Sequence, residues 1–181
     1  MNRVLPRLRR PFVAAAAAAV AIGLAGAPAA SAQQFFVPGS SFGFTVGDQC
    51  TGFETDPTSA EYRSQLADAT NAARVANNRE PIRVNDALSR VAADWSGAQA
   101  RENRMFHNPD VAAQIPTGWR SWSENVLQNY KCATPQQLVD QWMASPGHRV
   151  NLLRADHTDM GVGAAVAENG KLYATQVFAR Y

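Results

Sequence analysis

The chain has few cysteines and lacks the short motifs that most often mark catalytic or zinc sites. Its 181 residues contain two cysteines, no CxxC pair and no HExxH motif, and the GxSxG spacing occurs once, at residues 39–43, in a segment without the helical period that a nucleophile elbow requires. It also lacks internal repeats and runs of like charge, and beyond the N-terminal region no apolar stretch is long enough to span a bilayer. These absences argue against the common zinc peptidases and serine esterases.

The N-terminal region has the pattern of a cleaved export signal. Four arginines precede an apolar, alanine-rich run over residues 12–25, and this region contains no acidic residue. Ala30-Ser31-Ala32 then offers the small-x-small site that a signal peptidase accepts. The alternative, a membrane-spanning helix, needs about 20 apolar residues, and this run is shorter. We therefore predict a signal peptide over residues 1–32, a mature start at Gln33, and a secreted, extracellular or cell-envelope location.

Removing the signal changes the charge balance. The full chain has 17 basic and 15 acidic residues, and the four arginines leave 13 basic residues against 15, a net charge of −2. Without a basic block the mature chain has no electrostatic footprint for nucleic acid, so we expect no nucleic-acid partner. Arg9-Arg10 partly matches a twin-arginine signal, which leaves both the Sec and the Tat export routes open.

Cys50 and Cys132 are predicted to form a disulfide, because exported proteins fold in an oxidising compartment. The bond would close a loop of roughly 80 residues and contribute about 4 kcal/mol to stability. The alternative is that one cysteine is a metal ligand or a catalytic thiol, which would leave the other unpaired.

The mature chain divides into an extended arm over residues 33–55 and one domain over residues 56–181. The arm is rich in Gly, Ser and Phe and shows no helical period. Helical spacing of apolar residues and capping signals then predict four helices. The expected helices run from Asp56 (or Thr58, a competing cap) to Asn77, from Asn85 to Arg101, from Thr134 to Trp142, and from Ser145 to Leu153.

The C-terminal part changes from helical to extended spacing. Residues 160–166 and 171–180 are predicted as strands joined at Asn169-Gly170, because Asn-Gly is the strongest short hairpin signal. Residues 121–127 are a plausible third strand. The predicted helices come mainly before the predicted hairpin along the chain. This order predicts an α+β fold in which helices cover a small antiparallel sheet.

Histidine supplies the main candidates for chemistry. With Ser145 as N-cap, His148 would be the third residue of its helix, where the positive end of the helix dipole disfavours imidazolium. A neutral imidazole suits a metal ligand or a general base, although a residue that only fixes the turn explains His148 equally well. His157 has loop-like neighbours and is predicted to be solvated or structural.

A series of segments, in this order and spacing, resembles the CAP superfamily (cysteine-rich secretory proteins, antigen 5 and pathogenesis-related proteins), and most closely its bacterial SCP-like branch. The resemblance covers nearly all of the mature domain. It implies a three-layer α-β-α sandwich. The segments are residues 71–74, 84–89, 107–108, 123–126, 142–153, 160–163 and 173–178.

The resemblance also implies a cleft with two histidines and two glutamates. Carried over to this chain, the histidines are His107 and His148, and one glutamate is Glu124. In some members the histidines bind a divalent metal, commonly zinc. The second glutamate is missing: Ser145 stands where the animal members have it, and Asp140 is the nearest acid.

Three functions follow from these residues. The favoured one is a monomeric binding or interaction module whose cleft of His107, Glu124, Ser145 and His148 holds zinc, another divalent metal, a small apolar ligand or an envelope component. The second is a metal-dependent hydrolase with Glu124 as general base, although two protein ligands are fewer than the three usual at catalytic zinc. The third is a buried hydrogen-bond network that only organises the cleft wall.

Overall fold

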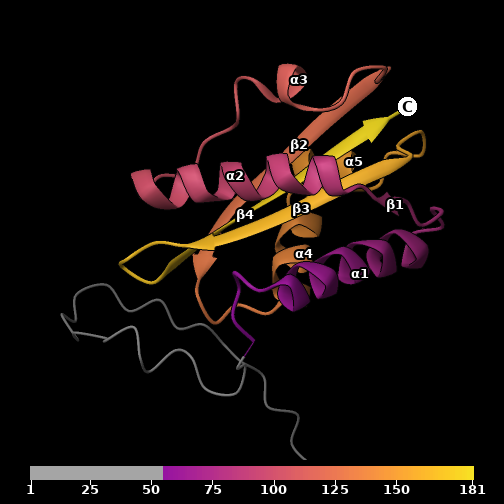
Figure 1. Cartoon of the computed structure of the whole chain (residues 1–181). Helices are drawn as coiled ribbons and strands as arrows, with labels where there is room; N and C mark the ends of the chain where they lie inside the picture. The colour runs from indigo at the N-terminus through magenta and orange to yellow at the C-terminus, as the bar shows by residue number, and fades with distance from the viewer. Residues whose placement is uncertain (1–54) are drawn as a thin grey trace, which may run out of the picture. The chain divides into compact units, whose positions relative to one another are not determined.

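The computed structural model describes residues 55–181, so the predicted signal peptide and nearly all of the predicted arm lie outside the described residues. A four-stranded sheet with strand order β1-β3-β4-β2 forms the middle of three layers (Figure 1). This arrangement confirms the predicted α-β-α sandwich. The elements are α1 Ala60–Ala76, β1 Arg83–Val84, α2 Asp86–Glu102, α3 Val111–Gln114, β2 Ser121–Tyr130, α4 Pro135–Ala144, α5 Pro146–Leu152, β3 Asp159–Val166 and β4 Lys171–Arg180.

Helix α2 covers one face of the sheet and lies directly against the backbone of β3 (Figure 1). A Cβ atom added at Gly161 would overlap the backbone of Leu88 and Ser89, and one added at Gly163 would overlap the backbone of Ala92. The two glycines of the predicted strand are therefore required by the close approach of the helix.

The opposite face of the sheet carries the larger core, which it forms with α1, α4 and α5. Tyr62, Trp142 and Phe178 are fully buried there. Successive side chains of a strand point to opposite faces, so Phe178 packs in this core while Val177 packs against α2. This alternation decides which layer each polar residue of β4 contacts.

The three long strands are antiparallel, as predicted, and β2 forms one edge of the sheet. Gly170, with φ of 78°, occupies the turn of the predicted β3–β4 hairpin. The short strand β1 was not predicted. It pairs in parallel with β3, with Arg83 opposite Asp159, so the sheet is mixed rather than purely antiparallel. Its two residues are too few to show a period.

Three predicted helix starts, at Asn85, Thr134 and Ser145, are confirmed and the first is wrong. Asn85 caps α2, and Thr134 forms the complete capping box of α4. Helix α1 is capped instead by Ser59, whose hydroxyl accepts the backbone N–H of the third helical residue at 3.0 Å. The Asp56 carboxylate accepts both the N–H and the hydroxyl of Thr58 at 2.8 Å. These bonds form a turn ahead of the helix and leave capping to the next serine.

Candidate functional site

The loop that carries His107 is fixed by the C-terminal half of α2. Asn103 ends this helix in the left-handed conformation, with φ of 48°. The backbone N–H of Phe106 donates to Gln99 Oε1 at 3.2 Å, and its carbonyl accepts Trp95 Nε1–H at 2.9 Å. The Phe106 and Trp95 rings also pack edge to face, with centroids 4.7 Å apart. The residue that precedes His107 is therefore held at both of its backbone polar groups.

Glu124, in the edge strand β2, binds His107 and the residue that follows it. Its Oε1 atom lies 2.7 Å from His107 Nδ1 and accepts the Asn108 N–H at 3.0 Å. The Glu124 side chain is 3% exposed, whereas the His107 side chain is 63% exposed. Burial raises the pKa of Glu124, and the bonds from Asn108 and His107 oppose this rise. The pairing leaves Nε2 of His107 available to a ligand.

His148 is the third residue of α5, and this helix is tied to β2 by two asparagines. Asn125 Nδ2 donates to the His148 carbonyl at 3.1 Å. Asn151 Nδ2 donates to the Glu124 carbonyl at 3.2 Å and to Asn125 Oδ1 at 2.9 Å. Burial lowers the pKa of His148, and the nearby His107 lowers it further. The neutral form predicted for His148 is thus favoured, with burial as the larger cause.

The two histidines reach the cluster from opposite layers of the fold. Glu124 and Asn125 are consecutive in β2, so their side chains point to opposite faces of the sheet. Glu124 binds the His107 loop on the α2 side, and Asn125 binds the carbonyl of His148 on the other side. Because β2 is an edge strand, the His107–Glu124–His148 cluster lies at the edge of the sheet.

Ser145 and Asp140 supply no second carboxylate to this cluster. Ser145 occupies the N-cap position of α5, as predicted, but its hydroxyl makes no capping hydrogen bond. Asp140 is exposed on α4 and accepts the amide of Gln136, one turn earlier, at 2.8 Å. Across residues 55–181, no group of three or more His, Cys, Asp or Glu side chains is placed to hold a metal ion. A metal at the cluster would therefore have His107 and His148 as its protein ligands.

His157 was predicted to be either solvated or structural. It is buried in the core, which excludes the solvated role. Its ring stacks on Phe178, with centroids 5.2 Å apart and planes 2° from parallel. Its Nε2 lies 3.4 Å from Ser123 Oγ, and its buried Nδ1 has no partner among the residues that the structure describes. Burial lowers its pKa to about 4; the charge of Arg154 adds to this effect and that of Asp156 opposes it.

Residues in the middle of β4 support the cluster and were not predicted as site residues. Thr175 and Gln176 are fully buried, although the strand around them is apolar. Thr175 bonds to Gln99 of α2, and Gln176 bonds to Asn125 of β2 and Thr70 of α1. Two adjacent polar residues inside an apolar strand are a signal that could have identified them.

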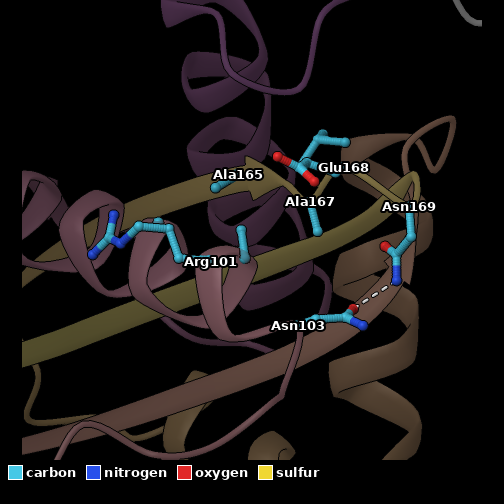
Figure 2. A pocket seen from close by; sticks show the side chains of 9 residues that line it. Arg101, Asn103, Ala165, Ala167, Glu168 and Asn169 are labelled. Atoms are coloured by element: carbon cyan, nitrogen blue, oxygen red, sulfur yellow. Dashed lines mark hydrogen bonds between the residues drawn. The ribbon is translucent and has the colours of Figure 1, made fainter.

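A hollow of about 510 Å³ lies away from the cluster, between the end of α2 and the β3–β4 turn (Figure 2). Asn169 Nδ2 donates to Asn103 Oδ1 at 2.7 Å and joins its two sides. Arg101 and Glu168 also line it. None of the residues predicted as site residues takes part.

Known proteins match this chain in both sequence and fold. Residues 67–178 match the cysteine-rich secretory protein family, CAP. The uncharacterized protein YkwD of Bacillus subtilis is 28% identical over 122 residues, which are 64% of this chain and 46% of YkwD. An extracellular SCP-domain protein from Bacillus anthracis has a TM-score of 0.56 at 25% identity, covering 67% of this chain and 41% of its own. An outer surface protein of Borrelia burgdorferi has a TM-score of 0.60 at 15% identity, covering 67% of this chain and 93% of its own.

The site and the fold define a CAP-type α-β-α domain, and the chain belongs to the CAP family. The resemblance seen in the sequence, including its bacterial SCP-like branch, is therefore confirmed. The chain spans less than half the length of the two Bacillus proteins that it matches.

Two further predictions concern the disulfide and the membrane. Cys132 is half-buried in the turn after β2, and Cys50 lies outside the described residues, so their pairing stays a prediction. Within residues 55–181, no helix combines the length and the apolar character needed to cross a membrane.

Proposed function

We propose that this CAP domain is a binding module that works outside the cytoplasm, and that His107 and His148 hold a divalent cation, with zinc the best fit. The observation that carries the proposal is the contact of 2.7 Å between Glu124 Oε1 and His107 Nδ1. Metal-bound histidines almost always donate their second ring N–H to a carboxylate, a carbonyl or water, which fixes the ring and its tautomer. Glu124 supplies that acceptor and leaves Nε2 for the metal.

The state of His148 supports the same proposal. Metal binding requires a neutral imidazole, and the pKa of His148 is lowered by burial and by repulsion from His107. A cation shared between the rings would replace this repulsion by two attractive interactions. Zinc usually has four ligands, so two protein ligands leave positions for water or for a donor group of an envelope component.

The hydrolase alternative is less well supported by the residues present. Glu124 Oε1 already accepts bonds from His107 and Asn108, which suits an orienting role better than that of a general base. A catalytic zinc site usually has three protein ligands, and this cluster offers two. Glu124 is therefore proposed as the residue that orients His107.

Export and the disulfide belong to the same proposal. We propose that residues 1–32 direct the chain out of the cytoplasm and that Cys50 and Cys132 then pair. The Bacillus anthracis relative is described as an extracellular protein, which supports this location.

Isothermal titration with zinc chloride tests the metal site. The purified mature domain is expected to bind one zinc ion, and His107→Ala and His148→Ala are each expected to abolish measurable binding. Asp140→Asn is the matched control, because Asp140 is the nearby exposed acid outside the cluster. Equal zinc binding by all four proteins would overturn the proposal. Absence of binding by the unmodified domain, together with a large drop in melting temperature for His107→Ala, would favour the purely structural role.

A further inference from the structure

Two adjacent buried residues of β4 connect to the two halves of the cluster. We propose that Thr175 and Gln176 are positioning residues: Thr175 fixes the loop that carries His107, and Gln176 fixes the helix that carries His148. The inference rests on the proposed metal site, since it identifies what sets the placement of the two metal-binding rings. Both side chains are fully buried.

The Thr175 branch runs through α2. Thr175 Oγ1 lies 3.0 Å from Ser96 Oγ and accepts Gln99 Nε2–H at 3.1 Å. Because the amide nitrogen of Gln99 is held by Thr175, its amide oxygen is left to accept the N–H of Phe106 at 3.2 Å. This bond fixes the backbone immediately before His107. Without the Thr175 hydroxyl, the Gln99 amide loses the partner that orients it.

The Gln176 branch runs through β2. Gln176 Nε2 donates to Thr70 Oγ1 at 2.8 Å, and the Thr70 hydroxyl donates to the Leu66 carbonyl at 2.7 Å. The direction of these bonds leaves Gln176 Oε1 to accept Asn125 Nδ2–H at 3.0 Å. The same Asn125 nitrogen donates to the His148 carbonyl at 3.1 Å. A chain of fixed donors and acceptors therefore connects α1 to the backbone of His148.

Neighbouring positions in one strand explain how a single element reaches both branches. Thr175 and Gln176 point to opposite faces of the sheet, so one contacts α2 and the other contacts α1 and β2. Buried polar networks whose members are satisfied hold their side chains in one arrangement. Strand β4 thus helps to position both histidines, which come from different layers.

The experiment removes each polar group separately while keeping the side chain close to its original size. Thr175→Val and Gln176→Leu are compared with Tyr62→Phe, which removes a buried hydroxyl bonded to the Ala133 carbonyl at 2.6 Å, outside both branches. Histidine ring resonances are recorded by NMR on the metal-free domain, and zinc affinity and melting temperature are measured in parallel.

We expect branch-specific results. Thr175→Val is expected to shift the ring resonances of His107 more than those of His148, and Gln176→Leu to do the reverse. Each variant is expected to weaken zinc binding by about threefold to tenfold, less than the loss typical of a residue that bonds directly to a ligand. Tyr62→Phe is expected to lower the melting temperature without either change, and Thr175→Ser to restore the His107 resonances.

The outcomes separate this inference from the metal proposal. The positioning roles are overturned, even when zinc binds, if neither variant shifts the histidine ring resonances. They are also overturned if both variants shift the resonances of the two histidines equally. Branch-specific shifts in a domain that binds no zinc support the positioning roles and overturn the metal site. If Thr175→Val or Gln176→Leu fails to fold, Gln99→Met and Thr70→Val break the same branches one residue further along.

Discussion

The carboxylate of Glu124 is buried, yet it binds the ring of His107, which is largely exposed, over a distance of 2.7 Å. An exposed side chain ordinarily loses rotamer freedom when it takes up a ligand. Here the buried partner removes much of that freedom in advance, so the ring is preorganised. The pair is therefore the most informative place to test the site.

Replacing Glu124 by glutamine is expected to weaken zinc binding by about tenfold to a hundredfold, the range typical of the acceptor behind a metal-bound histidine. Glutamine keeps the shape of the side chain and removes its charge. Since burial raises the pKa of Glu124, the charge is unfavourable where it lies, and the variant is expected to melt no lower than the parent. Titration calorimetry and thermal unfolding measure the two effects. Unchanged zinc affinity would contradict the orienting role.

The close contact between α2 and β3 predicts that an alanine at position 163 destabilises the fold. The added Cβ would overlap the backbone of Ala92, so Gly163→Ala is expected to lower the free energy of unfolding by about 1–3 kcal/mol. Gly147→Ala is the matched control, because a Cβ there meets no atom within 4 Å. The control is expected to be neutral or stabilising by up to about 1 kcal/mol. Urea unfolding compares them, and equal stability of the two variants would refute the close contact.

The buried His157 predicts a loss of stability in acid. Its folded-state pKa is about 4, below the ordinary value of 6.5, so the unfolded chain binds a proton that the folded chain excludes. This contribution to stability is complete above pH 6.5 and is lost as the pH falls towards 4, amounting to about 3 kcal/mol. His157→Phe keeps a ring for stacking and is expected to flatten the dependence.

Unfolding free energies near pH 6.5 and near pH 4 measure this effect. His148→Ala serves as a control and is expected to keep most of the slope, because the ring of His148 is less buried than that of His157. A slope that survives in His157→Phe would show that other groups cause the acid sensitivity.

Export and oxidation predict the covalent form of the mature protein. Intact mass spectrometry of the exported chain is expected to give a start at Gln33 and a mass lower by two hydrogens than that of the reduced chain. Cys50→Ser, Cys132→Ser and the double variant are expected to lose the same stability, about 4 kcal/mol, because each breaks the same bond. A mass that includes residues 1–32, or free thiols on both cysteines, would show the prediction to be wrong.

Local signals in the sequence predicted much of the fold. The Asn85 cap, the Thr134 capping box and the Asn169-Gly170 turn each depend on residues close in the chain, and all three are present. Strand β1 was missed because its two residues become a strand only by pairing with β3, more than 70 residues later. The start of α1 was misplaced because the Asp56 carboxylate accepts the N–H of Thr58 and does not cap the helix.

The site was predictable only in part. The resemblance identified His107, Glu124 and His148. The structure places Glu124 against His107, and His107 is near enough to His148 to lower its pKa. The supporting bond between Asn125 and Gln176 joins residues 51 positions apart across two strands, and local pattern carries no information about it. The prediction for His157 rested on its loop-like neighbours in the chain, whereas its burial depends on Phe178 in β4.

The absence of side chains at Gly161 and Gly163 has a mechanical consequence for the cluster. Where helix α2 crosses Gly161 and Gly163 it lies against the backbone of β3 with no side chain between them, so we expect the His107 loop to move with the sheet. Helix α5 is attached to β2 through hydrogen bonds of the Asn125 and Asn151 side chains, and not through backbone packed on backbone. When a ligand enters, we expect the His107 side to stay rigid and the His148 side to yield, so adaptation to ligand size is confined to one short helix.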